Sequence, residues 1–343
     1  MQKLIRWFNV ALIVGTLLIY TSSSFDPSKW WPSAFFGLFW PFAILGNLIM
    51  MVFWVYRKKW YGLISFVCLL AVWPGVQRVI GFNSSTASTE QSNTIHLVTF
   101  NVQDFSGLNT SGSSIAGSIE DYFQEKDIQA DVYCFQEGGN KDWTAITKAL
   151  GGAKRWISDN GNTAILTNLK VVGKGSLGFG KTSNSCIYLD LKAGEQVFRV
   201  YNVHFQSNKI SQKANQVVEE KRYNDKQLVK SILARYRKAV ILRSAQVKKL
   251  RQHIDQCPYP VMVCGDFNDQ PMSYVYKHLM DSGKLQDGFV ERGSGIGTTY
   301  NGVIPALRID YILADKQFEQ LEYKRLKPTF SDHFAIFSTV QVE

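Results

Sequence analysis

The 343-residue sequence predicts an α/β domain that is preceded by about three membrane-spanning helices. Two observations indicate the α/β domain. Short apolar runs typical of buried strands recur along residues 94–343, and amphipathic helical stretches alternate with them. A third observation concerns residues 1–82, which hold three long apolar segments. The chain therefore divides into an apolar N-terminal part and a larger C-terminal part of mixed composition.

The three apolar segments cover about residues 4–22, 34–56 and 60–80. A helix needs ~20 mostly apolar residues to cross the hydrocarbon core of a bilayer, so the second segment is long enough and the other two are close to the limit. Trp and Tyr cluster at the segment ends, where membrane-interface aromatics are found. We therefore expect residues 1–82 to form a membrane anchor with a lipid bilayer as its partner.

Two alternatives remain open for the anchor. The first segment alone could be a cleaved signal peptide, with Lys3 and Arg6 as its basic start and residues 21–24 as the cleavage region. The segments could instead be core helices of a soluble domain. The two further apolar segments that follow the first favour retained membrane helices.

Basic residues near the segment ends predict the orientation of the anchor. Lys3 and Arg6 precede the first segment, and residues 57–59 form a basic link between the second and third, whereas the link over 22–33 carries one Asp and one Lys. Because cytoplasmic loops carry an excess of Lys and Arg, the C-terminal part is expected outside the cytoplasmic (inner) membrane. Arg78 does not fit this rule.

A polar linker and a basic stretch are also expected. Residues 83–93 are Ser/Thr-rich and predict a flexible linker. The chain carries a net charge of +10, and the excess in the C-terminal part is concentrated between Lys209 and Arg251. This stretch predicts helices over 216–236 and 239–254. It is either a solvated amphipathic insert or a basic surface that faces substrate or membrane.

The five cysteines show no zinc-type spacing. Cys134 and Cys264 fall in apolar runs, where buried free thiols are common. A disulfide between Cys186 and Cys257 is left open, since an exported domain is in an oxidising compartment.

The most informative stretch follows Pro260. Residues 261–264 are apolar and predict a buried strand, after which Gly265 allows a sharp turn that presents Asp266 and Asn268. An acid and an amide two residues apart point the same way, which suits a base or metal ligand beside a donor to a phosphoryl oxygen. An Asx turn that caps the strand is the alternative.

Five more segments combine an apolar strand with polar residues. They are residues 95–100 before Asn101, residues 131–135 before Gln136 and Glu137, residues 197–201 before Asn202 and His204, residues 308–313 with Asp310 inside, and Ser331, Asp332 and His333 before residues 334–340. In chain order the six motifs read TFN, QE, NVH, GDFN, RIDYIL and SDH. With them, residues 93–343 resemble the endonuclease/exonuclease/phosphatase superfamily, the deoxyribonuclease-I-like metal-dependent phosphoesterases.

The resemblance implies a fold for residues 94–343. It is a four-layer sandwich, in which two mixed β-sheets pack face to face between outer helices. The site would lie at one edge, where the strand ends that carry the six motifs converge.

The resemblance also implies a metal site. Hydrolysis of a phosphodiester needs a hard cation, a general base for water and donors for the charge that develops on oxygen. Glu137 takes the role of principal metal ligand. Together with Asn101 and Asp332 it supplies the all-oxygen set that Mg²⁺ prefers, with Mn²⁺ as the alternative.

The remaining roles come from the resemblance as well. His333 is the expected general base and Asp310 the carboxylate that orients it, a pairing that sequence spacing alone does not give. Asp266 is the rival base. His204 would bind a phosphate oxygen or protonate the leaving group, and Asn268 would donate to a nonbridging oxygen. The chain departs from some nucleases at Asn162, where they place a Glu that holds the first histidine.

We expect a membrane-anchored phosphoesterase whose substrate is nucleic acid or a lipid headgroup, because fold does not decide between them. No protein partner is evident. The alternative is a catalytically silent, membrane-tethered module that recognises phosphate. The presence of all eight expected site residues favours the enzyme.

Overall fold

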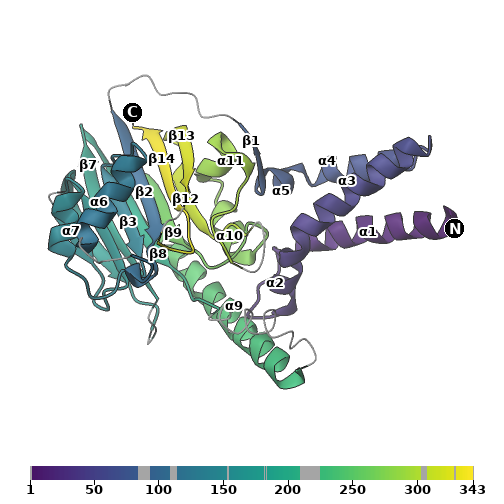
Figure 1. The fold of residues 1–343 in the computed structure, drawn as a ribbon, viewed down its shortest axis with the longest axis horizontal. Coiled ribbons are helices and arrows are strands. Elements are labelled where there is room, and N and C mark those ends of the chain that lie inside the picture. The colour runs from purple at the N-terminus through teal and green to yellow at the C-terminus, as the bar shows by residue number, and fades with distance from the viewer. Residues whose placement is uncertain are drawn as a thin grey trace.

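The computed structural model describes residues 2–83, 93–108, 114–152, 154–180, 182, 184–208, 225–302, 307–327 and 330–342. Figure 1 shows a sandwich of two β-sheets from which a group of N-terminal helices projects. The expected linker over 83–93 falls mostly outside the described residues, as does the first part of the basic stretch, residues 209–224.

Each of the two large sheets has six strands. One sheet consists of β6 (Lys170–Leu177), β7 (Ser185–Ala193), β8 (Gln196–His204), β9 (Val261–Asp266), β10 (Leu285–Asp287) and β12 (Asp310–Asp315), in the order β10-β12-β9-β8-β7-β6. The other consists of β2 (Thr94–Asn101), β3 (Val132–Gln136), β4 (Lys154–Ile157), β5 (Thr163–Thr167), β13 (Glu319–Leu326) and β14 (Ala335–Gln341), in the order β13-β14-β2-β3-β5-β4. Both sheets are mixed, as predicted.

A parallel pair lies inside each sheet. β2 pairs in parallel with β3, and β8 pairs in parallel with β9. Parallel neighbours end on the same side of a sheet, so the polar residues that follow these four strands are brought together at one edge. The apolar runs before them are buried on both faces, which explains their lack of polar alternation.

The two sheets share one apolar core. Leu97 and Val132 from one sheet pack with Val200, Met262 and Ile312 from the other. Cys134 and Cys264 lie in this core as free thiols, and the other three cysteines are free as well. The disulfide that the sequence left open between Cys186 and Cys257 is therefore not formed.

Helices cover the outer faces and complete four layers. α6 (Ile115–Glu125) and α7 (Trp143–Ala149) cover the sheet that contains β2, and α9 (Lys226–Asp255) and α10 (Tyr274–Met280) cover the sheet that contains β9. Two short elements, η2 (Gln103–Phe105) and α11 (Gly288–Arg292), lie in connections. α9 is continuous across residues 237–238, where the sequence analysis divided two helices, because nothing in that stretch breaks a helix.

The N-terminal part contains α1 (Gln2–Ser22), α2 (Pro32–Phe36), η1 (Gly37–Phe39), α3 (Trp40–Tyr56), α4 (Gly62–Ala71) and α5 (Trp73–Gln77). Two stretches among the described residues, Gln2–Ser22 and Pro32–Tyr56, are long and apolar enough to cross a membrane. The third expected helix, over residues 60–80, is divided. α4 ends before Val72, and Pro74 lies in the first turn of α5, where its missing N–H is tolerated.

Buried polar side chains join the N-terminal helices. Asn47 on α3 donates to the Thr16 hydroxyl on α1 at 2.8 Å, and Ser65 on α4 donates to the Asn9 side chain on α1 at 2.8 Å. Such interhelical hydrogen bonds satisfy polar groups that would otherwise be costly in an apolar environment.

The N-terminal part also packs against the sandwich. β1 (Ile80–Phe82) pairs antiparallel with β11 (Ser294–Ile296), which lies between α11 and β12 in the chain. Trp40 and Val76 pack with Met272, which precedes α10. The anchor expected over residues 1–82 therefore includes a strand that pairs with the C-terminal part.

Candidate active site

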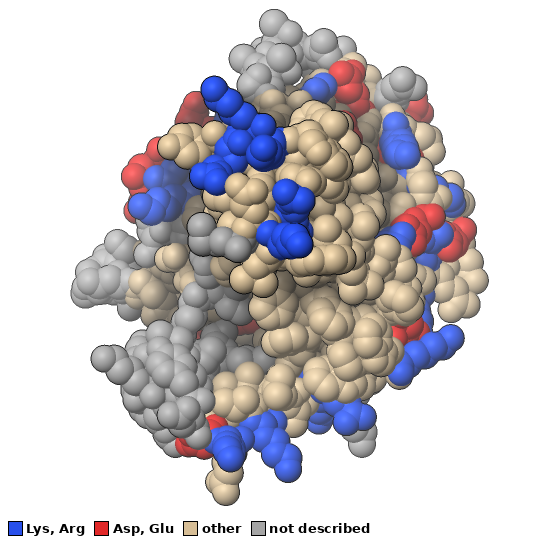
Figure 2. Space-filling model, turned by 90° about the vertical axis from the view of Figure 1, so that its right-hand side faces the viewer, with Lys and Arg blue, Asp and Glu red and all other residues tan. Residues whose placement is uncertain are grey.

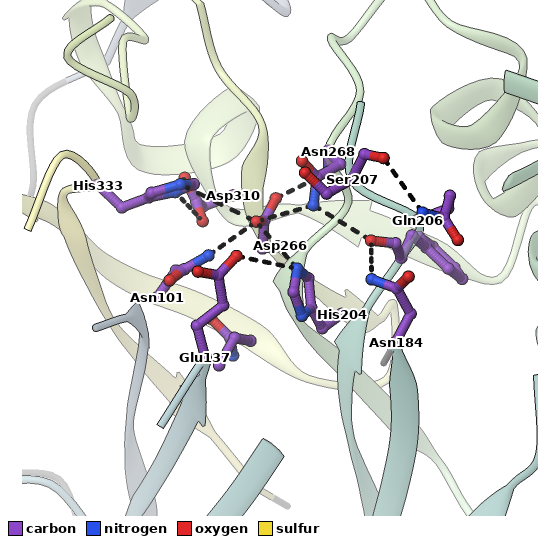
Figure 3. Close-up of polar contacts among 12 residues, drawn as sticks. Asn101, Glu137, Asn184, His204, Gln206, Ser207, Asp266, Asn268, Asp310 and His333 are labelled. Atoms are coloured by element: carbon purple, nitrogen blue, oxygen red, sulfur yellow. Dashed lines mark hydrogen bonds and ion pairs between the residues drawn. The ribbon is translucent and has the colours of Figure 1, made fainter. Parts of the chain in front are cut away.

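The expected site residues converge at one edge of the sandwich, as Figure 3 shows. Asn101 ends β2, Glu137 follows β3, His204 ends β8, Asp266 ends β9, Asp310 begins β12, and His333 precedes β14. The two parallel strand pairs bring the first four residues together. Asp310 joins them because its backbone lies directly opposite Asp266 in the β12–β9 ladder.

Asp266 is the hub of the site. One carboxylate oxygen accepts from the Asn268 backbone N–H at 2.7 Å, and the other accepts from the side-chain amides of Asn101 and Asn268, each at 3.0 Å. The side chain is 1% exposed. Asp266 is thus held in one orientation with most of its hydrogen-bonding capacity used.

Gly265 fixes where this carboxylate lies. The strand continues through Gly265 to Asp266, so the sharp turn expected at the glycine is absent. The glycine has φ of 140°, and a Cβ there would lie 1.9 Å from the Val203 carbonyl oxygen. Glycine is therefore required because β8 and β9 approach each other closely beside the site.

His333 and Asp310 form a pair. Both Asp310 carboxylate oxygens lie 3.0 Å from Nδ1 of His333, and Nε2 of the ring lies 4.0 Å from Asp266. Burial disfavours the charged ring, but the carboxylates of Asp310 and Asp266 outweigh it and raise the pKa of His333 from 6.5 to about 10. The carboxylate of Asp310 fixes the tautomer in which Nδ1 carries a proton.

His204 faces the site from β8. Its Nδ1 lies 2.7 Å from the Asn162 side-chain amide nitrogen, and its Nε2 lies 3.4 Å from Glu137 and 3.7 Å from Asp266. An amide N–H that donates to Nδ1 leaves Nε2 as the proton-bearing atom of the neutral ring. Asn162 thus holds the histidine where the sequence analysis noted a departure from some nucleases.

Glu137 is the most open carboxylate of this group. Its side chain is 37% exposed, against 1% for Asp266. The backbone of Glu137 has φ of 53°, as does that of Asn268. Non-glycine residues in this left-handed region are uncommon and collect at functional sites, where the surrounding structure maintains the strain.

Several carboxylates lie close together in the site, which is unfavourable unless positive charge is present. Burial first, and then repulsion from Asp310 and Glu137, outweigh the attraction of His333 and raise the pKa of Asp266 from 3.8 to about 7. Burial also raises the pKa of Asp332. Two groups of side chains have ligand atoms within 4.8 Å of one another: Glu137, His204 and Asp266, and Asp266, Asp310 and His333. The residues present therefore fit a divalent cation.

Of the other expected ligands, Asn101 contacts the Asp266 carboxylate and Asp332 lies beside His333. The Asn101 amide donates to Asp266, and its oxygen accepts from the Gln103 backbone at 3.0 Å. Asp332 is half-buried, with a carboxylate oxygen 3.8 Å from Nε2 of His333. Asn268, expected to donate to a phosphate oxygen, here donates to Asp266 and to the Phe205 carbonyl.

Sequence reasoning did not assign roles to Gln136 and Asn202, although both stand in motifs. The Gln136 amide donates to the Asn202 side chain at 2.7 Å, and Asn202 donates to the carbonyls of Phe135 and Ala164. These buried amides tie the two sheets together directly behind the site. The sequence signal that could have identified these two residues is their position near Glu137 and His204 in the motifs.

A second tie holds the loops that follow β8 and β9. Arg243 on α9 is fully buried and donates to Asp269 at 3.1 Å and to the Gln206 carbonyl at 2.8 Å. It thereby fixes the segments after His204 and Asn268 relative to each other. A lone Arg in a basic helix gave no sequence signal for this role.

Comparisons with known proteins agree with the fold. A solved endonuclease/exonuclease/phosphatase family protein from Bacteroides thetaiotaomicron is 17% identical, with a TM-score of 0.53, and the match covers 74% of this chain and 99% of that one. A humanized D. rerio TDP2 is 17% identical, with a TM-score of 0.53 and coverage of 73% and 100%. A mannosyl-6-phosphatase from B. thetaiotaomicron is 18% identical, with a TM-score of 0.52 and coverage of 72% and 100%.

Family models divide the chain much as its composition does. A search of curated proteins finds no match. A Domain of unknown function (DUF8431) matches residues 2–79. The model of the Endonuclease/Exonuclease/phosphatase family matches residues 98–333, which include every expected site residue. The predicted family and fold are thus confirmed, and the chain belongs to the endonuclease/exonuclease/phosphatase family.

Proposed function

We propose that this protein is a membrane-anchored, Mg²⁺-dependent phosphoesterase that hydrolyses a phosphodiester. The family supports a hydrolase of phosphoester bonds that depends on a divalent metal. The observation that carries the proposal is the convergence of the His333–Asp310 pair, Asp266 and Glu137 at one edge of the sandwich. A fully assembled constellation favours catalysis over a silent phosphate-binding module.

Glu137 would hold the cation, because its carboxylate is the most open in the group. Asn101 and Asp332 would complete an oxygen-rich set suited to Mg²⁺, or to Mn²⁺. When bound, the ion supplies positive charge that polarises the phosphoryl group and offsets the charge developing on its oxygens.

The protein's own side chains would move the protons. His333 accepts the proton of the attacking water at Nε2, while Asp310 holds Nδ1 and stabilises the imidazolium that forms. His333 can do so only when neutral, so its raised pKa must fall when positive charge enters the site. Asp266, with a pKa of about 7, is the rival base.

Two further groups would act on the substrate. His204 presents Nε2 toward the carboxylates, from where it would donate to a phosphate oxygen or protonate the leaving group. Asn268 would turn one amide hydrogen from its present acceptors to a nonbridging oxygen. Both donors would stabilise the charge that develops on oxygen.

The test is hydrolysis by the full-length protein in lipid discs. We would compare plasmid DNA, RNA, sphingomyelin-containing vesicles and a sugar phosphate, each with Mg²⁺ and with a chelator. Glu137→Gln and His333→Ala serve as blanks, and Asp281→Asn, a surface residue that follows α10, serves as the matched control. Cleavage of DNA, RNA or sphingomyelin that both blanks lose and the control keeps supports the proposal, whereas cleavage of the sugar phosphate alone would assign a phosphomonoesterase. Mg²⁺ binding without turnover of any substrate class supports the silent module instead.

Membrane anchoring is a separate part of the proposal. It is supported by Gln2–Ser22 and Pro32–Tyr56, whose length and composition suit membrane spans. The basic residues at 57–59 and in the first turns of α1 (Lys3 and Arg6) favour an inner-membrane protein with its site on the extracytoplasmic side. Resistance to alkaline extraction, and protease access to the C-terminal part from outside the cytoplasmic membrane, are the expected results. Release into the soluble fraction would contradict anchoring.

A further inference from the structure

The first half of α9 carries a large excess of positive charge. Residues 226–243 of the helix hold six Lys or Arg and no Asp or Glu, and its first acid is Asp255. Lys226 and Lys230 lie in the first turns, where the helix dipole disfavours cations. The nearest described acid is the N-cap residue Asp225, which precedes Lys226 and accepts from the Leu228 backbone N–H. Within α9 itself neither lysine has an acidic neighbour within one helical turn, so the charge suits an external anionic partner.

One stripe of α9 faces the N-terminal part. Tyr236 donates its hydroxyl to the Ala34 carbonyl at 2.8 Å, and Val240 packs with Ala34. One turn further, Ser244 donates to Asp26 at 2.5 Å. The spacing of four between Val240 and Ser244 is that of residues on one helix face.

The same stripe continues toward the start of α9, past the last contact with the N-terminal part. Leu233 precedes Tyr236 by three residues and Val229 precedes Leu233 by four, so both lie on this face. Each is 38% exposed. Exposed Lys226, Lys230 and Arg237 lie along one side of them. The exposed face is thus an apolar strip with one basic margin, which is a pattern found in helices that lie in a membrane interface.

The position of this face agrees with its composition. Asp26 and Ala34, which the stripe contacts further along, lie at or near the connection between the two membrane-length stretches, which is the bilayer boundary under the proposed anchoring. Exposed Phe36 and Phe39 lie beside Ala34, and Phe35 packs edge-on against Tyr236 with ring centroids 6.0 Å apart. Interfacial aromatics therefore lead directly onto α9.

The figures show the same arrangement. In Figure 1 the first turns of α9 project below the sandwich and reach as far toward the helix-bearing side as α2. Figure 2 looks at that side, and Lys and Arg gather along its lower edge beneath an uncharged surface.

We infer that residues 226–237 of α9 lie on the bilayer surface and bind anionic lipid headgroups. The inference rests on the proposed membrane anchoring and extends it, since it makes the C-terminal part itself a lipid-binding element. Lys226, Lys230 and Arg237 contact headgroup phosphates while Val229 and Leu233 enter the boundary with the acyl chains. The apolar strip beside the lysines favours lipid over a nucleic-acid backbone, which would leave the strip in water.

The test uses the full chain in lipid discs of neutral lipid, with and without an anionic phospholipid. Leu233→Cys, in a Cys257→Ser background, carries an environment-sensitive fluorophore, and the discs carry a headgroup-level quencher. We expect about twofold stronger quenching in the anionic discs, reduced by high salt. The same probe at Arg235→Cys, on the opposite face, should show no dependence on lipid charge.

Two matched pairs of charge reversals test whether lipid binding depends on this face of α9 or on the total charge of the protein. Lys230→Glu with Arg237→Glu should abolish the lipid dependence. Arg235→Glu with Lys238→Glu changes the net charge equally on other faces and should preserve it. Equal effects of the two pairs would overturn the inference, as would equal quenching in both kinds of disc.

Two outcomes separate this inference from the proposals on which it rests. Failure of the chain to enter discs contradicts the anchoring itself, whereas entry without quenching at residue 233 overturns only the role of α9. A response of the probe to an oligonucleotide rather than to anionic lipid would also overturn it and would assign the face to nucleic acid.

Discussion

The carboxylate of Asp266 touches more of the site than any other side chain described here, and its protonation should couple pH to metal binding. Its pKa is raised from 3.8 to about 7, so its contribution to folding is present below about pH 4 and is lost as pH rises through 7. The raised pKa of His333 acts in the same direction between pH 6.5 and 10.

We therefore predict that Mg²⁺ stabilises the protein more at pH 8 than at pH 5, because the cation takes the place of the proton at the carboxylate cluster. At saturation the rise in Tm at pH 8 should be about 3 °C or more, followed by tryptophan fluorescence of the full chain in detergent. Glu137→Gln should remove the effect. An equal rise at both pH values would contradict the coupling.

The pair formed by His333 and Asp310 gives a second prediction at this scale. Asp310→Asn should lower kcat by about 10²- to 10⁴-fold with a small change in KM, because the ring loses its orientation and its fixed tautomer. It should also lower the pKa of His333, measured by NMR titration, since Asp310 is the largest source of its increase. A purely structural role would leave that pKa unchanged.

Among the elements, η1 lies close to the loop that follows Asp266. A Cβ at Gly37 would lie 2.1 Å from the Gln270 side-chain nitrogen and 2.8 Å from the Met272 carbonyl oxygen. The loop from Asp266 to Met272 thus rests on the N-terminal part at one end and carries the site at the other.

Gly37→Ala should consequently displace this loop and lower kcat/KM by roughly 10- to 100-fold, since small displacements of catalytic groups are costly. Gly15→Ala in α1 is the matched control, because nothing lies within 4 Å of the Cβ that it adds. Steady-state assays of both variants in the same discs make the comparison. Wild-type kinetics of Gly37→Ala would show that the loop does not depend on η1.

How much of the fold and the site the sequence predicts depends on how far apart in the sequence the interacting residues lie. The strands and their terminal polar residues follow from local patterns, which is why the family and the fold were predictable. The pairing of Asp310 on β12 with His333 before β14 depends on how the two sheets pack, and the contact of Asn162 with His204 depends on the turn before β5 reaching the end of β8. Local patterns carry no information on either.

The same limit applies to the N-terminal part. Its apolar segments were visible, but the division of the third at Val72 follows from a proline whose effect on a membrane helix depends on its neighbours. In the sequence Arg243 resembles the other basic residues of α9, yet in the structure it is fully buried and pairs with Asp269.

At the scale of the whole molecule, the N-terminal part and the sandwich behave as one structure. β1 pairs with β11, Trp40 packs with Met272, and Tyr236 packs with Ala34. Asp26 adds an ion pair with Lys248 and a hydrogen bond with Ser244; although burial opposes its ionisation, these contacts hold its pKa below its usual value.

Removal of residues 1–82 should therefore destabilise the sandwich and not merely release it. We expect the Tm of residues 83–343 to fall by about 5 °C or more, because β11 loses its partner and Met272 and Tyr236 become exposed. A version that begins at residue 79 retains β1 and should recover part of the loss. Equal melting of all three forms, in the same detergent, would contradict this interdependence.

The contacts between the sandwich and the N-terminal helices also limit the volume in which the site can move. A domain on a loose polar tether samples a broad volume, and its effective concentration toward a target depends on tether length. Here several separate contacts hold the domain, so lengthening or shortening residues 84–92 should leave the position of the site relative to the N-terminal helices unchanged. Substrates must then reach a site at a fixed position. A second membrane or a bulky polymer can serve as substrate only if it fits at that position.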